Sequence, residues 1–387
     1  MELSEDQKKA LDRLLEWSRD QARSRYITLG GYAGTGKTTL IAVFRREAAR
    51  LAPKFRVAFC SYTGRAAQHL KNKLKEAGAV FPGDTVGTIH GLIYDPQESG
   101  DGRITGWNRK DLLERDLVIV DEASMVDGVL WNDLLSYNIP VIAVGDHGQL
   151  PPIGGEFNLM ASPEIMLNRI HRQAEGDPII EVSRHARETG LVPPRRYGPG
   201  AVKYLMDDPD AQERSGELLQ SYSGDTLILC GYNSTRVKLN RFIRGSLGFE
   251  GETPARNDRV ICLRNNRKKG IFNGMLGTIL EIAPDREGWY AARIQMDERE
   301  KPYDGLIYAA QFGAREAVNF TADRRNAAEG DLFDFGYAMT VHKAQGGQAR
   351  RVVLFEERFP KMTDDMWRRW LYTGVTRAEE ELYLFCS

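Results

Sequence analysis

Apolar residues in the first half of the chain fall in short continuous runs separated by helical patterns. The runs lie at residues 26–29, 57–60, 117–120 and 141–144, and each is followed by polar residues or glycine. Continuous apolar runs predict strands buried on both faces, as in a parallel sheet covered by helices. Ligands of such sheets bind beyond the carboxyl ends of the strands, where these polar residues lie. We therefore expect an α/β domain with a site at that edge.

The second half of the chain repeats this pattern. Apolar runs at 226–230, 351–355 and 381–385 predict buried strands, and helical patterns lie near 234–245 and 364–374. A second α/β unit is therefore expected.

Three segments depart from the α/β pattern. Residues 94–109 are rich in Gly, Asp and polar residues and are expected to form a small excursion from the first unit. Residues 258–332 contain short β-like runs separated by turn residues, which is typical of a small barrel. Residues 193–200 are rich in proline and glycine, which predicts a surface loop in the second unit.

The stretch from Gly31 to Thr38 has the pattern of a P-loop, Gly-x-x-x-x-Gly-Lys-Thr. It follows a predicted strand and precedes a helical pattern, as a P-loop requires. Glycines let backbone N–H groups approach phosphates, and the helix N-terminus attracts the same anion. Lys37 would contact the β- and γ-phosphates, and the Thr38 hydroxyl would bind Mg²⁺. The second half has no such loop, so we expect one nucleotide site, completed across a domain interface.

Carboxylates and an amide follow the next two strands of the first unit. Asp121 and Glu122 come directly after the run at 117–120. An aspartate there can hold the Mg²⁺ of a P-loop site, and the glutamate can polarise the attacking water. Gln149 lies in the loop after 141–144 and can contact the γ-phosphate or that water. The alternatives are an exposed acidic turn and a plain Gly/Pro turn, and the P-loop context favours the site.

The composition is that of a folded protein without a strong overall charge. The 387 residues, 42% of them hydrophobic and 28% charged, suffice for about two or three domains with cores. The net charge of −1 means that any nucleic acid would have to bind in a local basic groove. The four cysteines are scattered without ligand spacing, which predicts free thiols in a reducing compartment. No signal region or membrane-length apolar run is present, so we expect a soluble, cytoplasmic protein.

In order along the chain, these motifs and several others resemble those of superfamily 1 helicases of the RecD/Dda-like branch, over nearly the whole length. The matching segments are Leu3–Gln7 (Q motif), Gly31–Thr39 (motif I), Ser61–Ala67 (Ia), Thr88–His90 (Ib), Asp121–Met125 (II), Gly145–Pro152 (III), Leu167–Gln173 (IV), Thr340–Gly346 (V) and Tyr372–Ala378 (VI). Motif Ia departs slightly, because the family often has Ala-Pro-Thr where this chain has Ser61-Tyr62-Thr63.

The resemblance implies an α/β fold of two RecA-like P-loop NTPase motor domains with parallel sheets. The first would span residues 1–165, with a hairpin insertion at about 94–109 that acts as a wedge at the fork. The second would span 166–257 and 333–387, and an SH3-like β-barrel insertion would span 258–332. The implied activity is an ATP-dependent DNA helicase that moves 5′ to 3′ on single-stranded DNA.

The resemblance also assigns roles to individual residues. The catalytic residues would be Lys37, Glu122, Gln149, Arg172 and Arg377, the last two acting on the γ-phosphate as arginine fingers do. The nucleotide would be bound by Gln7 as the adenine reader, and by Gly34, Thr35, Gly36, Lys37, Thr38, Thr39, Arg172, Gly346 and Arg377. The metal ligands would be Thr38 and Asp121. Each arginine alone would more often be a surface salt bridge, and its motif favours the functional role.

A single strand of nucleic acid would lie over both motor domains. Its phosphates would be contacted by hydroxyls, imidazoles and cations, namely Thr63, Arg65, His90, Thr340, His342 and Lys343. The aromatic residues Tyr62, Tyr94 and Trp107 could stack on bases, although core packing is an equal alternative. The basic turn Arg264–Lys269 could line the path of the DNA, with a solvated charged turn as the alternative.

Two rival functions share much of this motif set. A viral-type superfamily 1 RNA helicase differs in 2′-OH contacts that no motif reveals. A nucleotide-gated remodelling module would hydrolyse ATP on DNA without unwinding it, and a P-loop kinase is more distant. We expect single-stranded and fork DNA as partners, ATP and Mg²⁺ as cofactors, and activity as a monomer. Single-strand-binding or replication and recombination proteins are further candidate partners, in the nucleoid or in a phage-infected cell.

Overall fold

A computed structural model describes residues 3–20, 22–98, 104–152, 157–169, 177–266, 269–297, 299, 301–316, 318 and 329–386. The chain divides into two compact units, residues 1–175 and 176–387. The predicted boundary between residues 165 and 166 is too early, because the strand at 165–167 pairs with the strand at 26–31 in the first unit. Within the part of the chain that the structure describes, no helix combines the length and apolar character needed to span a bilayer.

The first unit is built on a parallel sheet with the strand order β3-β2-β6-β7-β1-β8. Its strands are β1 (Tyr26–Gly31), β2 (Val57–Ser61), β3 (Thr85–Thr88), β6 (Leu117–Asp121), β7 (Val141–Gly145) and β8 (Ile165–Leu167). The four central strands are those that the apolar runs predicted. The P-loop, the Asp121–Glu122 pair and the loop of Gln149 all follow these strands, at the same edge of the sheet.

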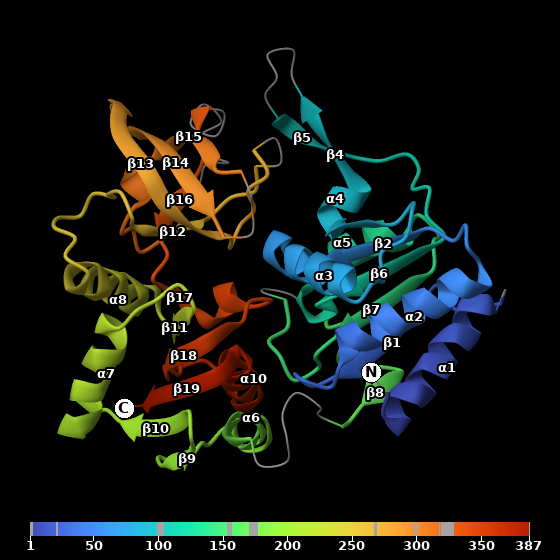
Figure 1. Ribbon diagram of the computed structural model, residues 1–387, viewed down its shortest axis with the longest axis horizontal. Coiled ribbons are helices and arrows are strands. Elements are labelled where there is room, and N and C mark those ends of the chain that lie inside the picture. Colours follow the sequence, from blue (N-terminus) through green and yellow to red (C-terminus); the bar gives the residue numbers. More distant parts are fainter. Residues whose placement is uncertain are drawn as a thin grey trace. The chain divides into compact units, whose positions relative to one another are not determined.

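Helices cover both faces of this sheet (Figure 1). Alternate strand residues serve opposite faces: Ile119 packs with one cluster, whereas Val118 and Val120 pack with the other. The first cluster includes residues of α1 (Glu5–Arg19), α2 (Lys37–Leu51) and α3 (Gly64–Glu76). The second includes residues of α4 (Ile89–Ile93) and α5 (Gly128–Leu135). Burial on both faces explains why the strands are continuously apolar.

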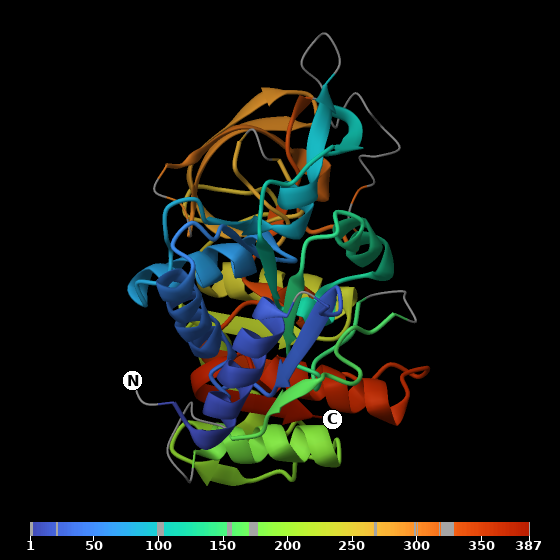
Figure 2. The same cartoon turned by 90° about the vertical axis from the view of Figure 1, so that its right-hand side faces the viewer.

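An antiparallel pair of strands within the first unit begins directly after α4 (Figure 2). It consists of β4 (Tyr94–Glu98) and β5 (Ile104–Arg109), and it starts with the register pair Tyr94 and Arg109. These strands lie within the segment that the sequence analysis set apart from the α/β pattern. We call this element the β4–β5 pair.

The second unit contains a sheet with the order β17-β11-β18-β19-β10-β9. Its strands are β9 (Arg196–Gly198), β10 (Ala201–Leu205), β11 (Thr226–Cys230), β17 (Ala338–Thr340), β18 (Ala349–Phe355) and β19 (Ala378–Cys386). All neighbours are parallel except β9 and β10. The prediction of a loop at 193–200 is therefore wrong for β9. Gly200, with φ of 82°, helps the chain turn back so that β9 pairs along the edge of the sheet.

Helices α7 (Pro209–Gln220) and α8 (Asn233–Ser246) contribute to one core of this unit, against β11 and β18. Helices α6 (Pro178–Glu188) and α10 (Asp364–Val375) pack together. The indole N–H of Trp367 in α10 donates to the carbonyl oxygen of Gly190, just after α6, at 2.8 Å. The helices α8 and α10 confirm the two helices predicted near 234–245 and 364–374.

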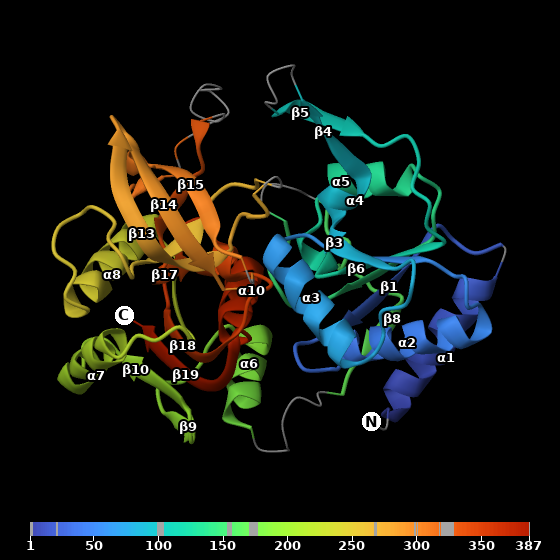
Figure 3. The same ribbon diagram turned by 45° about the horizontal axis from the view of Figure 1, so that its top comes forward.

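A five-stranded antiparallel sheet, of order β15-β14-β13-β12-β16, follows α8 (Figure 3). Its strands are β12 (Arg259–Cys262), β13 (Leu276–Arg286), β14 (Trp289–Met296), β15 (Tyr303–Tyr308) and β16 (Phe333–Phe335). Asp258 joins it to α8, because Arg244 donates two hydrogen bonds of 2.8 Å to its carboxylate. Since β16 pairs with β12, the sheet runs past residue 332, the limit that we predicted for this insertion.

Candidate nucleotide and nucleic-acid sites

The P-loop connects β1 to α2 in the predicted way. Gly34 and Gly36 have φ values of 82° and 78°, a left-handed backbone that glycine adopts without strain. The Lys37 ammonium donates hydrogen bonds to the carbonyl oxygens of Gly31, at 2.7 Å, and Tyr32, at 3.0 Å. The lysine therefore lies against its own loop, with its charge where a phosphate would be contacted.

Gln7 is buried beside this loop and is bonded to it. Its amide nitrogen donates to the carbonyl oxygen of Thr35 at 3.0 Å, and its amide oxygen accepts from the backbone N–H of Ser4 at 3.1 Å. A Cβ atom on Gly36 would lie 2.4 Å from the Gln7 nitrogen. Gln7 thus holds the P-loop through a hydrogen bond, a role that the resemblance to an adenine-reading motif did not predict.

The two carboxylates of motif II lie at the end of β6. Burial and the neighbouring Glu122 raise the pKa of Asp121 to about 6, while the nearby cations Lys37 and Lys73 oppose this shift. Because β6 and β1 both flank β7, Asp121 and the P-loop that carries Lys37 follow strands at the same edge of the sheet. Glu122 has φ of 54°, and its backbone N–H donates to Asp121 at 2.9 Å. A left-handed backbone in a residue with a side chain is strained, and such strain is common at functional sites.

The loop after β7 packs against the P-loop. The rings of Tyr32 and His147 have centroids 4.2 Å apart. Gln149 is buried, and its amide nitrogen lies 3.4 Å from the carboxylate of Asp146, which also accepts from the N–H of Gly148 at 2.9 Å. Asp146 thus fixes the loop that carries Gln149. The structure brings Gln149 to the same edge of the sheet as Lys37 and Asp121.

The donors at this edge fit a magnesium ion. Thr38 offers a hydroxyl at the start of α2, and Asp121 offers a carboxylate at the end of β6. Mg²⁺ is usually held by one or two carboxylates together with water and substrate phosphates, and not by an all-protein cage. Among the described residues, no group of three or more His, Cys, Asp or Glu suited to a metal occurs.

The residues of the first unit that were predicted to contact nucleic acid lie at or near the starts of helices. Thr63 caps α3, and its hydroxyl oxygen accepts from the N–H of Ala66 at 3.2 Å. In this bond the hydroxyl acts only as an acceptor, and Arg65 follows in the first turn of α3. His90, in α4, packs between aromatic rings, with centroids 4.5 Å from Tyr94 and 4.6 Å from Trp107. Two of the three predicted stacking residues therefore meet His90 at the base of the β4–β5 pair.

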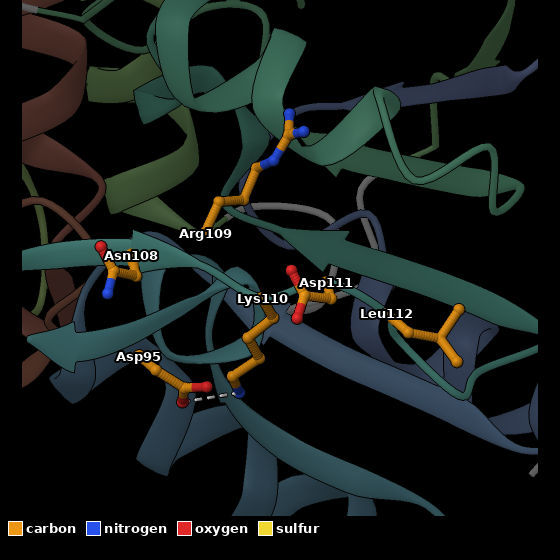
Figure 4. A pocket seen from close by; sticks show the side chains of 6 residues that line it. All are labelled: Asp95, Asn108, Arg109, Lys110, Asp111 and Leu112. Carbon is orange, nitrogen blue, oxygen red and sulfur yellow. Dashed lines mark ion pairs between the residues drawn. The ribbon is translucent and has the colours of Figure 1, made fainter.

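A polar pocket of about 600 Å³ lies beside this base (Figure 4). It is lined by Asp95, Asn108, Arg109, Lys110, Asp111 and Leu112. Lys110 is paired with Asp95 at 3.7 Å, and Arg109 extends away from that pair. Two carboxylates beside two cations do not select for phosphate, so we assign no nucleic-acid contact to this pocket.

Motifs V and VI meet within the second unit. The Arg377 guanidinium donates to the carbonyl oxygens of Thr373 and Gly347, both at 3.0 Å, and to the Thr376 hydroxyl at 3.2 Å. Gly346, beside it, has φ of 75°. Arg377 therefore bonds motif VI to Gly347, the residue directly after motif V, a role that its motif does not predict. Arg172, the other predicted arginine, lies outside the described residues.

Among the remaining predicted contacts of the second unit, Thr340 is buried, His342 is half-buried and Lys343 is exposed. Thr340 ends β17, and His342 and Lys343 lie in the short helix η3 (Val341–Ala344). Partial burial lowers the pKa of His342. In the basic turn, Lys269 and Asn266 both bond to buried Asp331, at 3.0 and 2.8 Å. These two turn residues therefore help to hold the five-stranded sheet.

Comparison with known proteins decides the family. Residues 2–192 match the family described as "AAA domain", and residues 335–385 match "UvrD-like helicase C-terminal domain". The RecBCD enzyme subunit RecD of Buchnera aphidicola is 31% identical over 93% of this chain and 70% of that protein. The chain belongs to the RecD family of superfamily 1 helicases. The ATP-dependent RecD2 DNA helicase of Deinococcus radiodurans is 29% identical over 98% of this RecD-family chain.

Solved structures show the same fold. A Bacteroides Pif1 helicase in complex with ADP-AlF3 and single-stranded DNA superposes with a TM-score of 0.58, at 18% identity, over 99% of this chain and 92% of that one. This likeness shows a mixed α/β fold with parallel sheets, consistent with RecA-like helicases. The RecD-family chain spans only 48% of the D. radiodurans RecD2 and 32% of a conjugal transfer protein TraA of Agrobacterium fabrum.

Proposed function

We propose that this RecD-family chain is an ATP-dependent DNA helicase that moves 5′ to 3′ on single-stranded DNA. The observation that carries the proposal is the placement of the P-loop, with Lys37, and of Asp121 at the same edge of the first sheet. In a chain of this family, a P-loop lysine at the same sheet edge as a half-buried motif II carboxylate supports nucleotide hydrolysis. The D. radiodurans relative is named an ATP-dependent DNA helicase, and the Bacteroides Pif1 structure contains single-stranded DNA. Both support the choice of DNA.

The residues of the first unit would divide the work of hydrolysis. The P-loop N–H groups and Lys37 would bind the phosphates, and Thr38 and Asp121 would hold Mg²⁺, which would neutralise charge on the phosphate oxygens. Glu122 would accept the proton of the attacking water, and Gln149 would orient that water. Arg172 and Arg377 would act on the γ-phosphate, so that the state of the nucleotide controls the grip of the motor on DNA.

The finer architecture is part of the same proposal. The five-stranded sheet would be an SH3-like barrel beside the DNA path, and the β4–β5 pair would be the wedge that parts the duplex. Thr63, Arg65, His90, Thr340, His342 and Lys343 would contact the strand, with Tyr62, Tyr94 or Trp107 stacking on bases. Conformational change that alternates the grip on the strand would then produce stepping.

A paired assay tests this function. ATP turnover is measured with and without single-stranded DNA, and separation of a 5′-tailed fork is measured in the same solution. We expect DNA to stimulate turnover and the fork to open only with ATP. Stimulated turnover without opening would instead support a remodelling ATPase, and preference for RNA would support an RNA helicase. No stimulation by either nucleic acid would contradict the proposal.

A further inference from the structure

The base of the β4–β5 pair is bonded to the helix that follows motif II. The first register pair of the two strands is Tyr94 and Arg109. The Tyr94 hydroxyl donates to the carboxylate of Asp133 in α5. The Arg109 guanidinium donates to the hydroxyl of Ser136, directly after α5, at 2.8 Å. Both strands are thus attached to one short helix.

A third contact closes the base. The Tyr137 hydroxyl lies 2.9 Å from the carbonyl oxygen of Ile93 and 2.7 Å from that of Lys110. These two residues directly flank the first register pair, and the Lys110 N–H donates to the Ile93 carbonyl oxygen at 2.9 Å. Tyr137 therefore bridges both strands where they enter the unit. We call Asp133, Ser136 and Tyr137 the α5 anchor.

The residues of the anchor are also bonded to one another, and its partner Tyr94 keeps its hydroxyl proton. The Ser136 hydroxyl donates to the Asp133 carbonyl oxygen at 2.7 Å. Burial and the Asp133 carboxylate raise the pKa of Tyr94 to about 12, so Tyr94 remains a hydrogen-bond donor at neutral pH. Its bond to Asp133 is therefore a charge-assisted one, stronger than a bond between neutral groups.

The same helix is linked to the nucleotide edge of the sheet. Only the short helix η1 (Ala123–Met125) and two further residues separate Glu122 from α5. The N-cap Asp127 fixes the start of α5 by accepting from the N–H of Leu130 at 2.9 Å. The element η1 packs tightly against the end of β7, since a Cβ on Gly145 would lie 3.1 Å from the Ser124 nitrogen. Because the connection is short and the contact is close, a shift of the motif II or motif III loop would displace α5.

We propose that the α5 anchor couples the nucleotide site to the β4–β5 pair, so that Asp133 and Tyr137 position the wedge for strand separation without taking part in ATP hydrolysis. This inference rests on the proposed helicase function. The sequence alone does not reveal it, because the three anchor residues lie outside every helicase motif.

The test uses the full chain with Asp133→Ala and Tyr137→Phe combined, Asp133→Asn as the conservative variant, and Tyr197→Phe as the control. Tyr197 also donates its hydroxyl to a backbone carbonyl, that of Pro193, at 2.8 Å, but in the second unit. Unwinding of a 5′-tailed duplex, DNA-stimulated ATP turnover and translocation on single-stranded DNA are measured in parallel, and melting temperatures verify folding.

We expect unwinding by the double variant to fall about tenfold, the factor that loss of a charge-assisted hydrogen bond produces. ATP turnover and translocation should change by less than about twofold, because the phosphate and water contacts remain. Asp133→Asn keeps an acceptor and should unwind like the parent chain, as should Tyr197→Phe. Unchanged unwinding in the double variant, or an equal fall in turnover and unwinding, would overturn the inference. A parent chain that neither hydrolyses ATP on DNA nor unwinds would overturn the proposed function instead.

Discussion

The side-chain amide of Gln7 donates a 3.0 Å hydrogen bond to the carbonyl oxygen of Thr35, in the middle of the P-loop. Because the other end of the amide binds Ser4, Gln7 ties the start of α1 to the loop. Replacing Gln7 with Ala should therefore weaken ATP and GTP binding alike, each by about tenfold, as expected for a buried hydrogen bond. The measurement is the Kd of both nucleotides. A loss confined to ATP would mean that Gln7 reads adenine and does not anchor the loop.

Gly36 occupies the tightest position of this contact. A Cβ atom there would meet the Gln7 nitrogen at 2.4 Å, on a backbone with φ of 78°. We expect Gly36→Ala to abolish measurable nucleotide binding, because the loop must shift. The control is Gly78→Ala, where φ is 60° but no atom lies within 4 Å of the new Cβ. That variant should cost about 1 kcal/mol of unfolding free energy and bind ATP normally.

Lys37 and Glu122 should separate binding from hydrolysis. Lys37→Ala removes the loop's fixed side-chain cation and should abolish turnover. Glu122→Gln should bind ATP but stall, because an amide cannot accept the proton of the attacking water. Nucleotide affinity and single-turnover hydrolysis are the measurements. Near-normal turnover in either variant would contradict the assignment of Lys37 and Glu122 to the ATP hydrolysis site.

Loss of Arg377 should lower stability as well as turnover, which its motif alone does not predict. Arg377 makes three hydrogen bonds inside its own unit. Arg377→Ala should therefore lower the unfolding free energy by about 2–4 kcal/mol, in addition to slowing turnover. Arg172→Ala should likewise slow turnover by about a thousandfold, as for other arginine fingers. Urea unfolding and ATP turnover test both, and parental turnover in both variants would contradict the motor mechanism.

His342 should make the second unit sensitive to acid. Burial lowers its pKa from the usual 6.5, so the unfolded chain binds the proton more tightly than the folded chain does. Its contribution to stability is therefore complete above about pH 6.5 and is lost as the pH falls below that value. His342→Asn should flatten the dependence of the unfolding free energy on pH in this range. An unchanged slope would show that His342 is not buried as a neutral group.

The central strands and the nucleotide site could be predicted because each has a local signature. Buried strands such as 117–120 are continuously apolar, and P-loop chemistry requires fixed residue types at fixed spacing. The short edge strands β8 and β9 were not predicted, because pairing with a neighbouring strand, and not their own three residues, defines them.

The side-chain contacts of Gln7, Thr63 and Tyr94 could not be predicted, because they depend on how separate segments pack or where a helix begins. Gln7 could be assigned to a motif, but its bond to Thr35 depends on how α1 packs beside the P-loop. Thr63 was predicted to contact nucleic acid, and its second role as the cap of α3 depends on where that helix begins. The attachment of Tyr94 to Asp133 joins residues far apart in sequence, and no periodic pattern encodes it.

Direction of movement tests the central claim most directly. Purified chain is given matched DNA duplexes with only a 5′ or only a 3′ single-stranded tail, with Mg²⁺ and ATP, and with Lys37→Ala as the inactive control. We predict that the 5′-tailed duplex is unwound while the 3′-tailed duplex is not, although both tails stimulate ATP turnover. Unwinding of the 3′-tailed duplex alone, or of neither duplex despite rapid turnover, would contradict the account.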